Sequence, residues 1–273
     1  MTLPSTAPSH PAGLAFDTLA ERYDDMFTNS LIGRAQRDAV WSMAIRTFRR
    51  GDHILELNCG TGEDALFLAH HGIAVLACDA SAKMIAVANR RRSLDAPTSA
   101  VRFVVLPTEE IAVARLFGPF DGVFSNFSGL NCVSDIADLA HHLATLVRRG
   151  GSALLCLSGR LCLWESCWFL IRGDAGRAVR RWNGHTTATV GGASVKLQYH
   201  TVKRLRKVFA PYFHLRSWTG IGVTVPPSYL ESFATRHPIF LSQLRSVDGV
   251  ISGWPLFRSI GDHVLLSFDR TSS

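Results

Sequence analysis

Short apolar runs alternate with stretches of helical spacing along most of this chain, and no other feature constrains the fold as strongly. The predicted strands are residues 53–58, 74–79, 102–106, 122–126 and 152–157, and the predicted helices between them are 64–71, 81–92 and 136–148. Strands that alternate with helices in this way form a parallel sheet with helices on both faces. We therefore predict an α/β, doubly wound sheet.

Both flanks of this pattern differ from its centre. Residues 16–27 and 35–48 have apolar side chains at spacings of three and four, so they are predicted to form two amphipathic helices of an N-terminal cap. Between residues 161 and 192 the alternation is lost, and this Trp- and Arg-rich stretch is predicted to be an insertion after strand 5. A helix at 202–209, a strand at 213–225, short helices and loops at 226–260 and a final strand at 262–268 follow.

Composition favours a globular protein of the cytoplasm. The hydrophobic fraction is 47%, and the six cysteines show no CxxC pairing, which is typical of reduced thiols. The polar, Pro-rich start does not look like a signal peptide. The longest apolar stretch, 154–171, contains Arg160 and Glu165, so no membrane span is expected. The net charge of +7 is spread over short basic clusters at predicted helix ends, which favours a small-molecule partner over a nucleic acid.

A glycine-rich turn follows the first predicted strand and leads directly into a helix. It reads Glu56-Leu57-Asn58-Cys59-Gly60-Thr61-Gly62, and its glycines lack the Cβ that would keep a ligand away from the backbone. Asp79 ends the second strand at the spacing where an acidic side chain meets ribose hydroxyls. Turn and carboxylate together predict an adenosine site.

These residues resemble motifs I and II of class I S-adenosylmethionine-dependent methyltransferases, of the small-molecule type. The resemblance implies a Rossmann-like seven-stranded sheet, mostly parallel with an antiparallel last strand, and S-adenosyl-L-methionine as cofactor. By that resemblance Glu56 orders the loop and faces the methionine ammonium, Asp79 clamps the ribose, and Ala80 and Met84 line the adenine. Gly60, Thr61 and Gly62 form the binding turn.

Two positions depart from the family pattern. Asn58 stands where the first glycine is usual, which is tolerated if its backbone is either ordinary or left-handed, a conformation that Asn accepts. After the third strand the chain reads Leu106-Pro107-Thr108-Glu109 where Asp-Ala-Glu is frequent. A backbone contact from Thr108 is then expected to read the adenine, with Glu109 as a poorer substitute.

The resemblance also assigns the acceptor side. Phe16-Asp17 and Tyr23-Asp24 resemble an N-terminal arm that folds over the cofactor, with Tyr23 beside the sulfonium, which an aromatic ring attracts. Arg34 or Arg37 is expected to hold the cofactor carboxylate by a bidentate fork, and we favour Arg37. Asn126 and Phe127, after the fourth strand, are the predicted floor of the reaction site. The insertion is expected to enclose the acceptor with aromatic residues: Trp164, Trp168, Phe169 and Trp182, with Tyr199 beyond.

These inferences divide the chain into a disordered tail (1–13) and a single methyltransferase domain (14–273). That domain comprises cap helices (14–50), a cofactor-binding core (51–160), a substrate-side insertion (161–200) and the C-terminal part of the sheet (201–273). The predicted function is methyl transfer to a small, partly apolar molecule by in-line displacement. A nucleic-acid methyltransferase, a non-catalytic S-adenosylmethionine-binding protein and, as a minor alternative, an NAD(P)-dependent dehydrogenase remain open. No metal site is expected, and the candidates for a general base are His185, Tyr199 and His200.

Overall fold

Seven strands form one sheet at the centre of the protein. The computed structural model describes residues 11–271 of the 273-residue chain. In spatial order the strands are β3 (Val101–Val105), β2 (Ala74–Asp79), β1 (His53–Leu57), β4 (Phe120–Ser125), β5 (Val147–Ser158), β9 (His263–Arg270) and β8 (Phe213–Ile221). The pairs from β3 to β5 are parallel, and β9 is antiparallel to both of its neighbours. This confirms the predicted sheet, including its antiparallel last strand.

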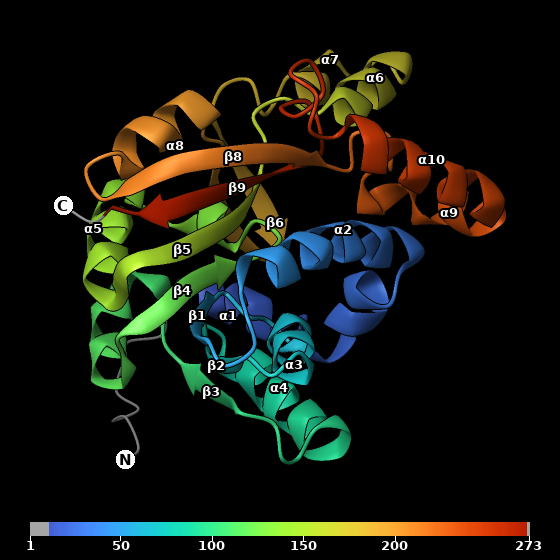
Figure 1. Ribbon diagram of the computed structural model, residues 1–273. Helices are drawn as coiled ribbons and strands as arrows, with labels where there is room; N and C mark the ends of the chain where they lie inside the picture. Colours follow the sequence, from blue (N-terminus) through green and yellow to red (C-terminus); the bar gives the residue numbers. More distant parts are fainter. Residues whose placement is uncertain (1–10, 272–273) are drawn as a thin grey trace.

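Helices cover both faces of this sheet (Figure 1). On one face lie α2 (Leu31–Thr47), α3 (Glu63–His70) and α4 (Ala82–Asp95), which bury apolar side chains such as Val40, Leu68 and Ile85. On the other lie α5 (Ile136–Leu146), α8 (Val202–Phe209) and the 3-10 segment η3 (Thr108–Phe117), with Leu143 and Phe209 fully buried. Because a helix covers each face, the central strands read as apolar runs in the sequence.

The N-terminal segment is not the single helix predicted for residues 16–27. It consists of α1 (Pro11–Asp17), a 3-10 turn η1 (Ala20–Arg22) and a π-helical turn η2 (Asp24–Thr28). The Asp17 carboxylate accepts hydrogen bonds from the Ser81 hydroxyl and the Lys83 backbone N–H, so α1 ends where it is fixed to α4. Tertiary contacts therefore override the helical spacing. Of the predicted tail, residues 1–10 lie outside the described part, whereas residues 11–13 are helical.

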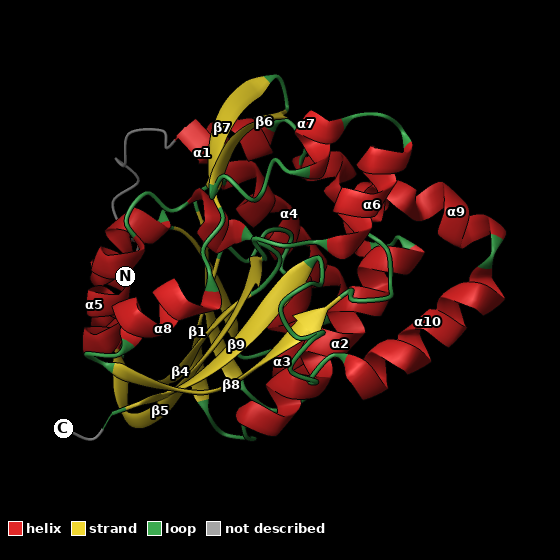
Figure 2. Cartoon of the chain, turned by 90° about the horizontal axis from the view of Figure 1, so that it is seen from above, coloured by secondary structure: helices red, strands yellow, loops and turns green. Residues whose placement is uncertain are grey.

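The insertion after β5 forms helices and strands that were not predicted from the sequence. It contains α6 (Leu163–Ile171), α7 (Ala175–Ala178) and a two-stranded hairpin, β6 (His185–Val190) and β7 (Ala193–Gln198). Figure 2 shows this hairpin projecting beside α1. β8 ends four residues earlier than predicted. It is followed by η5 (Ser228–Leu230), α9 (Glu231–Arg236) and α10 (Pro238–Ile251). A short 3-10 turn, η4 (Gly129–Cys132), lies earlier in the chain, after β4. The 14 residues of α10 make it longer than the short helices expected there.

Two further sequence expectations can be compared with the described residues. All six cysteines are free thiols, as their spacing predicted. Within residues 11–271, no helix combines the length and the apolar character that crossing a membrane requires.

Candidate active site

The turn after β1 depends on left-handed backbone at three residues. Asn58, Gly60 and Gly62 have φ values of 56°, 54° and 81°. Asn58 therefore takes the left-handed option open to it, and its side-chain amide donates to the Thr108 hydroxyl at 3.1 Å. A Cβ on Gly62 would lie 2.6 Å from the ring of Phe103, so only glycine fits there. Gly60 has open space on that side, which leaves its backbone accessible to a ligand.

Asp79 ties the end of β2 to this turn. One carboxylate oxygen accepts from the Gly60 N–H at 2.9 Å, and the other accepts from the Ser81 N–H at 2.8 Å. Burial raises the pKa of Asp79, and the hydrogen bonds from Ser81 and Gly60 oppose that rise. Each oxygen keeps a lone pair that can accept from a further donor. Asp79 can therefore hold the turn and a ligand hydroxyl group together.

A cavity of about 230 Å³ opens at the carboxyl edge of the sheet, beside this turn. Seven predicted site residues line it: Tyr23, Asn58, Gly60, Asp79, Ala80, Met84 and Phe127. The remaining wall comes from α1, from the segment after β4 and from the hairpin, namely Ala12, Gly13, Phe16, Ser128, Gly129, Cys132, Val190, Val195 and Leu197. The lining thus combines the backbone of the turn and a carboxylate with a mostly apolar wall.

Glu56 lies in β1 just before the turn and is not part of the cavity lining. Its side chain is 1% exposed, and its Oε2 atom has no hydrogen-bond partner among the described residues. Burial raises the pKa of this carboxyl well above its usual value, and the nearby Asp64 adds to the rise while Arg37 counteracts it. A cationic group brought near Glu56 would stabilise its ionised form. An ammonium is such a group.

Two aspartates fix the N-terminal arm, residues 11–28, over the cavity. Asp17 accepts from the Ser81 hydroxyl at 2.5 Å and from the Lys83 N–H at 3.0 Å. Asp24 accepts from the Thr61 hydroxyl at 2.7 Å and pairs with Arg91. Tyr23 lies between these attachments, and burial raises its pKa to about 12, with Arg37 opposing the rise. Its phenol therefore stays protonated at neutral pH.

The hairpin in turn covers the arm. Its turn contains Gly191, where a Cβ would lie 1.6 Å from the Thr18 hydroxyl and 2.5 Å from the Ala15 carbonyl oxygen. This contact leaves room only for glycine, so the hairpin lies directly against α1. Val190, Val195 and Leu197 also reach the cavity wall. The cavity is thus covered by two segments, the arm and the hairpin, which precede and follow the cofactor-binding core in the sequence.

Arg37, the predicted carboxylate ligand, lies in a buried polar cluster behind the wall. Its guanidinium is 2.6 Å from the Asp64 carboxylate, which also accepts from the Trp41 indole and the Asn126 amide. The Asn126 side-chain oxygen accepts from the Phe127 N–H, and the Arg37 guanidinium lies 4.8 Å above the Phe127 ring. Arg37 and Asn126 therefore position Phe127, and neither lines the cavity. Arg34 pairs with Glu63 at 3.0 Å.

Thr61, Gly62, Thr108 and Glu109 also lie outside the cavity lining. Thr61 holds the arm through Asp24, and Thr108 holds Asn58. Glu109 is exposed beside Thr108 at the start of η3. Their places next to lining residues make them supports of the site, and the predicted contact of Thr108 and Glu109 with adenine stays a prediction.

None of the three candidate bases reaches the cavity. His185 is exposed at the start of β6, whereas Tyr199 and His200 are buried directly after the end of β7. A histidine does lie beside the wall: the ring of His263, at the start of β9, is 5.5 Å from that of Phe127. Burial lowers its pKa, with Asp262 opposing that change. No local pattern marked His263, because its neighbours come from distant segments.

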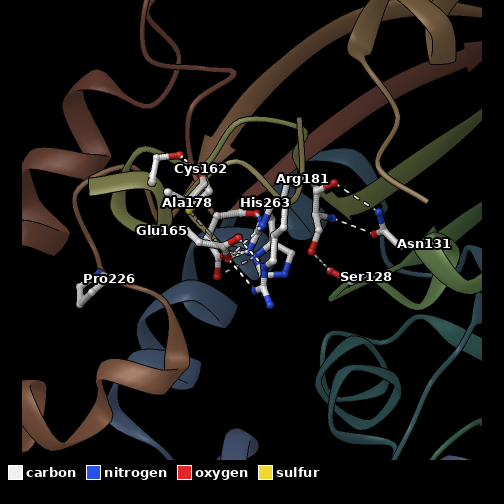
Figure 3. Close-up of polar contacts among 12 residues, drawn as sticks. Ser128, Asn131, Cys162, Glu165, Ala178, Arg181, Pro226 and His263 are labelled. Carbon is white, nitrogen blue, oxygen red and sulfur yellow. Dashed lines mark hydrogen bonds and ion pairs between the residues drawn. The ribbon is translucent and has the colours of Figure 1, made fainter. Parts of the chain in front are cut away.

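The aromatic residues of the insertion do not form the acceptor wall that we expected. Trp164 and Trp168 pack against a cluster from α2 and α9, and Trp182 is exposed. Instead the insertion is held by buried charges: Arg181 contacts Glu165 at 2.9 Å and Asp262 at 2.8 Å (Figure 3). This network fixes α6 and α7 to the start of β9. Only aliphatic residues of the hairpin reach the cavity.

Comparisons with known proteins agree with this geometry. Residues 54–151 match the family model "Methyltransferase domain". Demethylmenaquinone methyltransferase of Mycobacterium marinum is 32% identical over 144 residues, which cover 52% of this chain and 56% of that protein. The corresponding protein of Beutenbergia cavernae is 34% identical over 147 residues, 53% of this chain and 56% of its own length. The chain thus spans little more than half the length of these curated relatives.

Solved structures share the fold at low sequence identity. A putative S-adenosylmethionine-dependent methyltransferase of Listeria monocytogenes has a TM-score of 0.59 at 17% identity, over 87% of this chain and 99% of its own. The [4+2]-cyclase SpnF has a TM-score of 0.61 at 15% identity, over 100% and 99%. Residues 54–151, which contain the glycine turn, are thus similar to a methyltransferase domain, and the seven-stranded sheet has the fold of solved S-adenosylmethionine-dependent methyltransferases.

Proposed function

We propose that this protein transfers a methyl group from S-adenosylmethionine to a small, partly apolar acceptor. The carrying observation is the covered cavity whose lining combines polar and apolar groups. Gly60 and Asp79 supply polar contacts, and Phe127, Val195 and Leu197 supply apolar contacts. A nucleotide-like group and an apolar acceptor would be held side by side in such a space.

The residues present fit this cofactor. Asp79 has lone pairs left for ribose hydroxyls, Gly60 leaves its backbone open, and Glu56 has an unpartnered oxygen that suits an ammonium. When bound, S-adenosylmethionine supplies a methyl group already activated on a sulfonium. The chain then has to align the acceptor and exclude water, and alignment alone is worth about 7–11 kcal/mol for well-oriented reactants.

The cavity wall limits how the acceptor is activated. Its titratable side chains among the described residues are Tyr23, Asp79 and Cys132. Burial raises the pKa of Tyr23 to about 12 and that of Cys132 to about 11, so both stay protonated at neutral pH. Asp79 is engaged by two backbone N–H groups. We infer that the acceptor atom is nucleophilic without a base in the wall, as in an ionised phenol or an electron-rich quinol ring.

The names of the relatives support a quinol-like acceptor, since demethylmenaquinone is by name a quinone and the reduced form of a quinone is a quinol. A panel of phenols, quinols, amines and tRNA, read by release of S-adenosylhomocysteine, tests the class of acceptor. We expect turnover with quinols or phenols. Turnover on tRNA alone would refute the proposal. Cofactor binding without turnover on any acceptor would indicate a binding protein.

Leu197→Asp tests, in the same assay, whether the apolar wall of the cavity contacts the acceptor. Leu197 belongs to the apolar wall, so we expect lower turnover with nearly unchanged affinity for S-adenosylhomocysteine. Lys196→Asp, on the exposed side of the same strand, is the matched control. If both variants behave like the wild type, the hairpin does not contact the acceptor.

A further inference from the structure

The outer side of α10 is an apolar stripe without a covering element among the described residues. Ile239, Phe240, Val247 and Val250 lie on one side of this helix by their helical spacing, and Ile239 and Val250 are 77% and 64% exposed. The opposite side holds the helix to the protein through buried Leu241 and through Asp248, which accepts from the Thr224 N–H at 2.6 Å. The apolar residues of the outer stripe are therefore not explained by packing into the core.

Aromatic contacts extend this stripe across α9 to the end of α6. Phe240 lies 6.1 Å from Phe233, and Tyr229 lies 5.9 Å from Phe169, measured between ring centroids. Figure 2 shows α6, α9 and α10 together along one border of the molecule. We call this surface the outer face, and its exposed apolar residues are Leu170, Ile171, Tyr229, Phe233, Ile239, Phe240, Val247 and Val250. An exposed apolar surface of this extent is typical of a binding face.

A cationic groove of about 490 Å³ lies within the outer face, between α6 and α9. Arg172, Arg236 and His237 line it together with aromatic side chains, and no acidic residue of the described part of the chain does. The Arg172 guanidinium lies 4.2 Å above the Trp168 ring. The nearest acid on α9, Glu231, is occupied by the N–H groups of Leu31 and Ile32 at 2.7 and 3.0 Å. The groove therefore favours an anionic group.

We propose that the outer face docks on a membrane surface that carries anionic lipid headgroups. Apolar and aromatic side chains of this size enter the boundary between headgroups and acyl chains, while arginines beside them contact lipid phosphates. The uncharged stripe of α10 and the two arginines of the groove supply these two components on one surface. A second copy of the chain fits less well, because a twofold interface would bring the same cationic grooves together.

Sedimentation of the full chain with vesicles tests this proposal. We compare vesicles of phosphatidylcholine alone with vesicles of phosphatidylcholine and phosphatidylglycerol, and we expect binding to the anionic vesicles that weakens with added salt. Ile239→Glu combined with Val250→Glu should abolish that binding. Arg172→Gln combined with Arg236→Gln should reduce it by about tenfold or more, from the usual contribution of a basic residue near an anionic membrane.

Leu94→Glu is the matched control, because Leu94 is 76% exposed on α4, away from the outer face. It should bind anionic vesicles like the wild type. The proposal is overturned if the wild type does not sediment with anionic vesicles, or if Leu94→Glu loses as much binding as the outer-face variants. It is also overturned if light scattering shows a dimer that Ile239→Glu dissociates while vesicle binding stays absent.

Discussion

Replacing Asp79 by alanine tests the site most directly. Asp79 uses one lone pair of each oxygen for the Gly60 and Ser81 N–H groups and keeps the others for ribose hydroxyls. Alanine removes all of these acceptors at once. It should therefore affect two quantities, the order of the turn and the affinity for the cofactor.

The magnitude follows from the number of bonds. A hydrogen bond to a charged group contributes about 1.5–3 kcal/mol, so two ribose bonds correspond to roughly 3–6 kcal/mol. Since 1.4 kcal/mol is a factor of ten in Kd, Asp79→Ala should weaken binding by about 10²–10⁴-fold. Asp79→Asn keeps one acceptor oxygen and should lose about half of that free energy.

Titration calorimetry with S-adenosylhomocysteine measures this effect, and thermal unfolding of the same samples reports the state of the turn. Asp95→Ala is the control, because Asp95 is an exposed carboxylate at the end of α4. It should bind like the wild type. Asp79→Ala protein that folds and still binds S-adenosylhomocysteine within about threefold of the wild-type Kd would remove Asp79 from the site, by the tenfold scale above.

Three further predictions concern the cover and its attachment. Tyr23→Ala should lower kcat more than cofactor affinity, because it opens the arm, and a wild-type rate in this variant would contradict the lid role. Tyr23→Phe should leave the pH profile of turnover unchanged between neutral pH and about 9, since the raised pKa of about 12 keeps the phenol of Tyr23 protonated there. Gly191→Ala should push the hairpin away from α1 and speed amide hydrogen exchange in the arm. Gly192→Ala is the control, because Gly192 also has a positive φ but a Cβ there would have nothing within 4 Å. Equal exchange rates in the two variants would show that the hairpin does not hold the arm. Arg181→Met should cost about 3–5 kcal/mol of unfolding free energy, because the buried Asp262 carboxylate loses its arginine partner and the buried Glu165 carboxylate keeps only Arg180. The exposed Arg177→Met should cost little, and similar melting temperatures for the two variants would refute this.

The parallel half of the sheet could be predicted from the sequence, because its information is local. Apolar runs of the core alternate with helices along the chain, and Ser81 caps α4 by accepting from the Met84 N–H. The glycine turn and Asp79 were likewise predictable, since they stand at fixed places next to strands. The hairpin had a usable signal as well: Gly191-Gly192 stands between two alternating runs, which is a turn sequence for hairpins.

Other parts of the site depend on partners far away in the sequence. The cofactor role expected for Arg37 gave no hint of its buried contact with Asp64, because a long-range ion pair leaves no local pattern. The break in the helix predicted for residues 16–27 has the same origin, since Asp17 and Asp24 bind residues of α4 and of the glycine turn. The aromatic insertion was misjudged because burial against α2 and α9, not ligand contact, explains Trp164 and Trp168.

The position of β9 has a consequence for how the chain folds. β5 ends at Ser158, and its sheet partner β9 begins only at His263, so the sheet remains open along the β5 edge until nearly the whole sequence is present. Within residues 11–271, β8 pairs only with β9, so it cannot join the sheet earlier. Pairings between such distant segments are slow to form, because a long loop must close first. During synthesis, at roughly 5–20 residues per second, the β5 edge is therefore exposed to wrong pairing for several seconds, and chaperone binding should concentrate on this nascent intermediate.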